Sequence, residues 1–218
     1  MRALATRARA VGLAIRGALP PRQGDPVPDD TRAIALLGPD EPNFWARFTA
    51  AKEYRDGQPD PLDRWSKRVI GELAHAEGAT AIFPSDGPPY APFMAWALDS
   101  GQAWTSPVGP LVHADAGLFI SFRAALALPR DIDLPQPATQ PCPTCARPCA
   151  TACPVDALSD AQPYDVAACQ AHLASDQGSD CRLNGCLVRR ACPTADSFTR
   201  LPEQSGFHMS AFIKAYRS

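Results

Sequence analysis

Cysteine is absent from the first 141 residues of this chain of 218 residues, although the whole chain has eight. A chain of this length can bury one substantial core, or one core together with a small module that a cofactor stabilises. Because every cysteine lies at or beyond position 142, the sequence favours the second arrangement, with the larger core in the cysteine-free part.

The net charge is small, and long apolar runs are lacking. The formal net charge is -2, so no global positive field attracts a polynucleotide, and we expect no nucleic-acid partner. The longest uncharged run near the start, Ala10 to Ile15, is too short for a signal-peptide core or a membrane span. We therefore expect a soluble, cytoplasmic protein without a membrane partner. Five arginines and no acidic residue among the first 24 residues leave a transit peptide as an alternative.

Apolar runs and turn residues predict alternating helices and strands before residue 130, which indicates an α/β (α+β) domain. The expected elements are a helix over 3–10, strands over 13–19, 33–37 and 79–83, and helices starting at 42, 62 and 93. Four prolines, Pro129, Pro135, Pro137 and Pro141, then mark an extended linker. The sequence thus predicts an α/β domain over 1–135, with a cofactor-binding role left open, and a second module over 136–218.

The run from Gly117 to Leu128 alternates in a way that predicts one long strand. One face would be core: Leu118, Ile120, Phe122, Ala124, Leu126 and Leu128. The other would carry Arg123 among small residues, either solvated or forming the wall of a site for an anionic or amide-bearing ligand. Arg123, Ser121 and His113 are candidate contacts to a cofactor. For His113 the alternative is a purely structural role.

The cysteines fall into two groups. The first is Cys142-x2-Cys145-x3-Cys149-x3-Cys153-Pro154, and the second comprises Cys169, Cys181, Cys186 and Cys192, followed by Pro193. Short loops rich in thiolates are typical of iron-sulfur sites, and two [4Fe-4S] clusters need the eight thiolates that the chain has. Zinc held by C-x2-C pairs is the main alternative, and disulfides are a weaker one for an intracellular chain.

The first group resembles the bacterial ferredoxin run C-x2-C-x2-C-x3-C-P, with one extra residue between its second and third cysteines. In ferredoxin modules the last cysteine of each run ligates the other cluster. The resemblance therefore implies two ligand sets. Cluster 1 would be held by Cys142, Cys145, Cys149 and Cys192, and cluster 2 by Cys153, Cys169, Cys181 and Cys186.

The second group departs from the ferredoxin pattern, because its loops are longer. Cys169 is expected on a short helix that starts at Asp165. Three arginines near these loops, Arg182, Arg189 and Arg190, either offset the charge of a cluster or form a solvated basic edge. Few large apolar side chains lie between 142 and 193, so we expect cofactors to supply much of the folding free energy of this module.

The order of parts resembles the epoxyqueuosine reductase family. The similar features are an α/β domain, the pattern Gly117-x-x-x-Ser121-x-Arg123, ferredoxin-type loops, a cysteine on a helix (Cys169) and a closing Cys192-Pro193. The resemblance implies a nitroreductase-like first domain that holds a corrinoid and receives electrons from two clusters. The acidic catalytic motif and Gly-Leu-Gly segment of that family have no match here. The C-terminal helical repeats that hold tRNA in longer members are also missing, so action on tRNA is not expected.

Three functions follow from these observations. The first is a ferredoxin-like electron-transfer protein with two [4Fe-4S] clusters and a redox partner protein. The second is a reductase in which these clusters feed cobalamin or flavin and act on a small-molecule substrate or corrinoid, with no catalytic residue identified. The third is a non-redox interaction protein stabilised by zinc.

Overall fold

The computed structural model describes residues 1–215, so the last three residues of the module expected over 136–218 lie outside the description. The chain divides into two units. The α/β unit comprises Met1–Ala103 and Ser121–Ala138. The cysteine unit comprises Trp104–Ile120 and the chain from Thr139 onward. The second unit thus contains the expected module from Thr139 onward, together with a segment that precedes the linker, Trp104–Ile120, which we call the hairpin segment.

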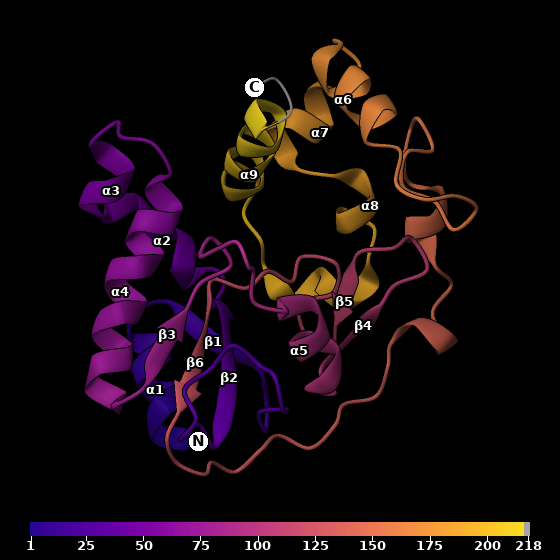
Figure 1. Ribbon diagram of the computed structural model, residues 1–218. Helices are drawn as coiled ribbons and strands as arrows, with labels where there is room; N and C mark the ends of the chain where they lie inside the picture. The colour runs from indigo at the N-terminus through magenta and orange to yellow at the C-terminus, as the bar shows by residue number, and fades with distance from the viewer. Residues whose placement is uncertain (216–218) are drawn as a thin grey trace. The chain divides into compact units, whose positions relative to one another are not determined.

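The α/β unit is built on a four-stranded antiparallel sheet with the order β1-β2-β6-β3. Its strands are β1 (Leu13–Leu19), β2 (Ala33–Pro39), β3 (Thr80–Ile82) and β6 (Ala124–Leu128). Its helices are α1 (Arg2–Ala10), α2 (Asn43–Ala50), α3 (Lys52–Arg55), α4 (Pro61–Glu77) and α5 (Phe93–Asp99). Helices α1 and α4 cover one face of the sheet, and α5 lies against β1 on the other (Figure 1). The expected mixed α/β class is confirmed.

The core of this unit follows the apolar pattern of the sequence. Strand β2 is buried along its whole length, as its continuous apolar run predicts. Helices α2 and α4 begin close to the expected positions, and the rings of Phe44 and Trp65 meet edge to face with centroids 5.4 Å apart. Both aromatic side chains are part of the buried core.

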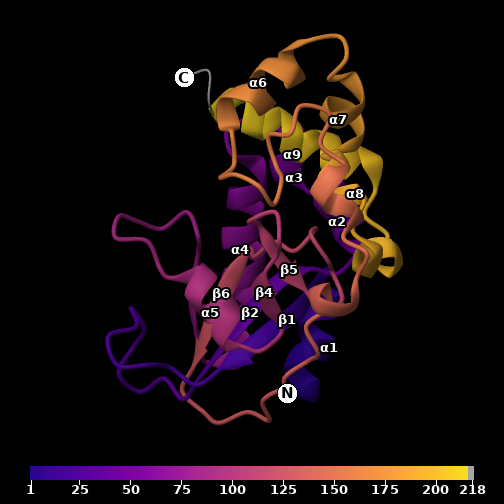
Figure 2. The ribbon, with the colours of Figure 1, turned by 90° about the vertical axis from the view of Figure 1, so that its right-hand side faces the viewer.

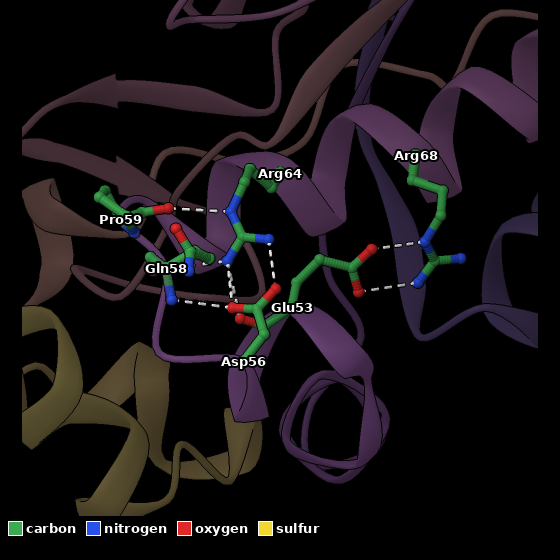
Figure 3. A network of polar contacts seen from close by, with 6 residues as sticks. All are labelled: Glu53, Asp56, Gln58, Pro59, Arg64 and Arg68. Carbon is green, nitrogen blue, oxygen red and sulfur yellow. Dashed lines mark hydrogen bonds and ion pairs between the residues drawn. The ribbon is translucent and has the colours of Figure 1, made fainter.

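Ion pairs join α3 to α4 (Figure 3). The buried Glu53 receives hydrogen bonds from Arg68 at 2.6 and 3.1 Å, and these bonds lower the pKa of Glu53 to about 2. Arg64 holds both carboxylate oxygens of Asp56 at 2.7 Å and donates to the carbonyls of Glu53 and Pro59. Because bidentate arginine pairs fix orientation, this network clamps the turn between the two helices.

The prediction of one long strand over 117–128 is wrong. The strand β6 covers only Ala124–Leu128, and all five of its residues are buried. The expected half-exposed face is not found, because α4 packs against β6 and all five residues of the strand are buried. Ahead of the strand, Gly117 has a φ of +51° and the amide of Phe119 donates to the carbonyl of Ala116, so the chain turns there instead of extending.

The predicted linker contains no helix or strand between residues 129 and 141. Its first part is tied to the α/β unit, because the Ala138 amide donates to Gly101 O and Gln102 Nε2 donates to Gln136 O. The first unit therefore extends to Ala138, a few residues beyond the expected end at 135.

The cysteine unit consists of loops and helices (Figure 2), and most of its helices are short. The hairpin segment contributes β5 (Leu111–His113), which pairs with β4 (Ala103–Thr105). The remaining elements follow the linker. They are the 3₁₀ helices Cys142–Thr144, Pro148–Thr151 and Pro193–Phe198, and the α-helices α6 (Val166–Ala174), α7 (Ser179–Asn184), α8 (Leu187–Arg190) and α9 (Pro202–Ala215). Across residues 1–215, no helix is both long and apolar enough to cross a membrane.

Candidate metal centres in the cysteine unit

Four cysteines line the first pocket, which has an empty volume of about 320 Å³. They are Cys142, Cys145, Cys149 and Cys192, the set that the ferredoxin resemblance implies for cluster 1. Two tight 3₁₀ turns present the first three, and Cys192 stands immediately before the third 3₁₀ helix. Arg147, at a φ of +55°, turns its amide toward Cys145 and donates to the Sγ atom over 3.3 Å. The left-handed turn thus supplies a backbone donor to a candidate ligand.

The thiols of the first pocket influence one another. Burial raises the pKa of Cys142 and of Cys149, and the neighbouring thiol of Cys192 raises each further. Cys149 and Cys192 also belong to an apolar cluster with Val112, Leu118 and Val188. The apolar surroundings therefore disfavour free thiolates, which a positively charged metal centre would stabilise.

The hairpin segment closes this pocket from a distant part of the sequence. A Cβ atom on Gly117 would stand 2.9 Å from Cys192 Sγ and 2.8 Å from the backbone nitrogen of Ala195. His113 holds the turn that brings Gly117 there, because its Nδ1 accepts from the amides of Asp115 and Ala116 at 3.0 and 3.2 Å. The backbones of His113 and Gly117 also exchange two hydrogen bonds. The structure thus gives His113 a positioning role in the pocket wall.

The other four cysteines line the second pocket, with an empty volume of about 350 Å³. They are Cys153, Cys169, Cys181 and Cys186, the set that the resemblance implies for cluster 2. Cys169 lies on α6, as expected, and Asp165 caps this helix by accepting from the Ala168 amide at 2.9 Å. Cys181 lies on α7, and Cys186 immediately precedes α8.

Burial also dominates in the second pocket. It raises the pKa of Cys169, and a hydrogen bond from the Tyr164 side chain partly opposes that rise. The pKa of Cys181 is raised by burial as well, with the Leu187 backbone acting in the opposite sense. Each pocket therefore combines buried thiols with a small number of hydrogen-bond donors, the two features that tune thiolate-bound clusters.

The chain matches no family model, no curated protein and no solved structure. All eight cysteines are free thiols. Within the described residues, no group of three or more His, Cys, Asp or Glu side chains is arranged to hold a single metal ion. A four-iron cluster places iron and sulfide between its ligands, so its thiolates stand farther apart than ligands that converge on one ion.

The three arginines near the second group each have a partner in the protein. Arg182 donates to the carbonyls of Leu173 and Ser175 at the end of α6, and Arg189 donates to Leu118 O. Arg190 pairs with Asp180 and donates to Gly185 O. These side chains link the cysteine-bearing segments to neighbouring backbone, a contact that the sequence did not predict. Whether they also offset the charge of a cluster stays a prediction.

The remaining candidate residues are split between the units. Ser121 and Arg123 belong to the α/β unit, whereas His113 belongs to the cysteine unit. Arg123 lies 3.8 Å from Asp63 with 18% of its side chain exposed, and burial lowers its pKa. The Ser121 hydroxyl is buried and has no hydrogen-bond partner among residues 1–215.

Sequence reasoning missed two residues at the first pocket. Ser106 lines the pocket beside the cysteines, and Gly117 lies against Cys192. Both precede the first cysteine by at least 25 positions, and the apolar alternation around Gly117 indicated a strand. The turn residues Gly109 and Pro110 were the one local signal of a hairpin here.

Proposed function

We propose that this chain is an iron-sulfur electron-transfer protein that holds two [4Fe-4S] clusters, one in each cysteine pocket. The observation that carries the proposal is the grouping of the eight thiols. Two pockets are each lined by four of them, and each group joins cysteines from separate segments of the chain. Four thiolates are the usual ligand set of a [4Fe-4S] cluster.

Several features of the first pocket fit such a group. Its lining is mostly apolar, burial raises the pKa values of Cys142 and Cys149, and the hydroxyl of Ser106 is buried without a partner among the described residues. Buried polar groups are rarely left unpaired, so an unpaired hydroxyl on a residue that lines a pocket supports a ligand there. When bound, each cluster would supply one-electron transfer.

The protein's own residues would then hold and insulate the two centres. Leu158 and Val188 line the second pocket and also belong to the apolar cluster that contains Cys149 and Cys192. A shared apolar wall therefore separates the pockets and excludes water between them. A redox partner protein is the expected source or acceptor of electrons.

The experiment is anaerobic purification followed by reconstitution with iron and sulfide. The proposal expects a broad visible absorbance that dithionite bleaches, with iron and acid-labile sulfide in equal amounts. Replacing Cys145 with serine should remove about half of the absorbance, because one of two clusters loses a ligand. Zinc without iron or sulfide would reject the redox function and favour the zinc-stabilised interaction protein.

The resemblance to epoxyqueuosine reductases adds a second candidate, a corrinoid- or flavin-dependent reductase fed by these clusters. The supporting observation lies in the α/β unit, where Ser121 has a buried hydroxyl without a partner in the described chain and Arg123 is two residues away. Titration of the reconstituted protein with cobalamin and with FMN tests this candidate. A spectral shift that Arg123→Gln weakens supports it, and no shift with either compound leaves electron transfer alone.

A further inference from the structure

Ser106 stands at the start of the turn between β4 and β5, and 5% of its surface is exposed. Its backbone is fully engaged, because its amide donates to Pro110 O at 3.0 Å and its carbonyl accepts from the Gly109 amide at 3.1 Å. These bonds fix the residue in place. The hydroxyl remains, and within residues 1–215 it has no hydrogen-bond partner.

Buried hydroxyls are rarely left without a hydrogen-bond partner, so the position of this one indicates that a partner binds there. Ser106 lines the first pocket together with the four thiols of that pocket. Arg147, in the same lining, offers donors only, and apart from Thr194 the other lining side chains are apolar or cysteine. Sulfur is therefore the principal acceptor that the side chains of this pocket present to the hydroxyl.

We propose that the Ser106 hydroxyl donates a hydrogen bond to a sulfur of the cluster in the first pocket and raises the reduction potential of that cluster. The inference rests on the proposed function and assigns Ser106 a positioning and tuning role. Reduction adds negative charge to the cluster sulfurs, so a fixed donor stabilises the reduced form more than the oxidised form. Burial strengthens this preference, because the local dielectric constant is low.

The second pocket offers a contrast. Among the described residues that line it there is no serine or threonine. A change at Ser106 should therefore act on one cluster and leave the other as an internal reference.

The experiment is a redox titration of the reconstituted protein followed by electron paramagnetic resonance, with Cys145→Ser identifying the signal of the first pocket. In Ser106→Ala we expect that signal to show a tenfold lower ratio of reduced to oxidised cluster at a given potential. For a one-electron couple this is a shift of about 59 mV to lower potential. The signal of the second pocket should not move.

Two further variants sharpen the test. Ser205→Ala removes another buried serine of the same unit that lines neither cysteine pocket, and both potentials should stay at their wild-type values. Ser106→Thr keeps a hydroxyl and should keep the wild-type potential. An unchanged first potential in Ser106→Ala, an equal shift of both clusters, or loss of iron from the first pocket would overturn the inference. Absence of iron from the wild-type protein would instead reject the proposed function.

Discussion

The two units of this protein are stabilised by different means. Of the twelve largest side chains that are fully buried in the described part of the chain, eleven belong to the α/β unit and one, Leu118, to the cysteine unit. The α/β unit also has an ion pair between the buried Glu53 and the partly exposed Arg68. The cysteine unit has short helices and two pockets lined by thiols.

The cysteine unit therefore has thiol-lined pockets where the α/β unit has large, fully buried side chains. Burial of large apolar side chains is the main favourable contribution to folding, and the cysteine unit has little of it. A bound cofactor contributes folding free energy wherever it binds the folded chain better than the unfolded one. The comparison therefore predicts that the two units respond to different perturbations.

Removal of the metal should have the largest effect. Treatment of the reconstituted protein with an iron chelator and oxidant should make residues 142–193 at least about 100-fold more sensitive to protease, because a loss of about 3 kcal/mol raises the open population by that factor. Cleavage within the α/β unit should stay slow, and mass spectrometry of the fragments distinguishes the two. Equal resistance of the cysteine unit with and without metal would contradict this view.

Gly117→Ala should have the next largest effect, confined to the first pocket. The new Cβ would meet Cys192 Sγ and Ala195 N at less than 3 Å, and the positive φ adds about 1 kcal/mol of backbone strain. We expect loss of most iron from the first pocket, measured by the corresponding paramagnetic signal, while the second is retained.

Gly109→Ala is the matched control for this variant. Gly109 also has a positive φ, +94°, but a Cβ there would meet nothing within 4 Å among the described residues. It should therefore carry the backbone strain without the collision and keep both signals. If both alanine variants lose the first cluster equally, the contact between residue 117 and Cys192 does not explain the loss of iron.

Glu53→Gln should have the smallest effect, and it should act on the α/β unit. Pairing with Arg68 lowers the pKa of Glu53 from 4.5 to about 2, so its contribution to stability is fully present above pH 4.5 and is lost as the pH falls toward 2. Allowing for the partly exposed Arg68, we expect a loss on the order of 2 kcal/mol at pH 7 and a smaller difference at low pH.

Urea unfolding followed by tryptophan fluorescence measures this effect, because Trp45, Trp65 and Trp96 all lie in the α/β unit. Glu72→Gln is the control, since Glu72 is 70% exposed and lies 3.7 Å from the same arginine. It should change the free energy of unfolding little. A Glu53 variant that is as stable as the control at pH 7 would contradict the assignment.

Much of the α/β unit could be predicted from the sequence, because local patterns determine it. The apolar run of β2 and the helical spacing of Leu62, Trp65 and Val69 in α4 are signals of this kind. The prediction of a strand over 117–128 was wrong because it used local patterns alone. Gly117 is held in a left-handed turn by backbone hydrogen bonds with His113, and the alternation of neighbouring side chains gives no sign of these bonds.

The cysteines could be grouped from their spacing and the ferredoxin resemblance, and the pockets contain the same two sets of four. The contacts of Ser106 and Gly117 with the first pocket could not be predicted from the sequence. Both residues belong to a segment that is distant from the cysteines in the sequence and close to them only in the folded unit. Contacts between segments that are far apart in the sequence do not change the local pattern of apolar residues. The partners of Arg182 and Arg189, which are backbone carbonyls, were unpredictable for the same reason.

The central claim is that each pocket holds one cluster through its own four thiols, and exchange of single ligands tests it most directly. Cys192→Ser, Cys153→Ser and Cys145→Ser should each be reconstituted and titrated with electron paramagnetic resonance. The account predicts that Cys192→Ser removes the same signal as Cys145→Ser, although 47 positions separate the two residues, and that Cys153→Ser removes the other. If Cys153→Ser removes the signal that Cys145→Ser removes, and Cys192→Ser leaves that signal intact, each run keeps its own four cysteines and the account is wrong.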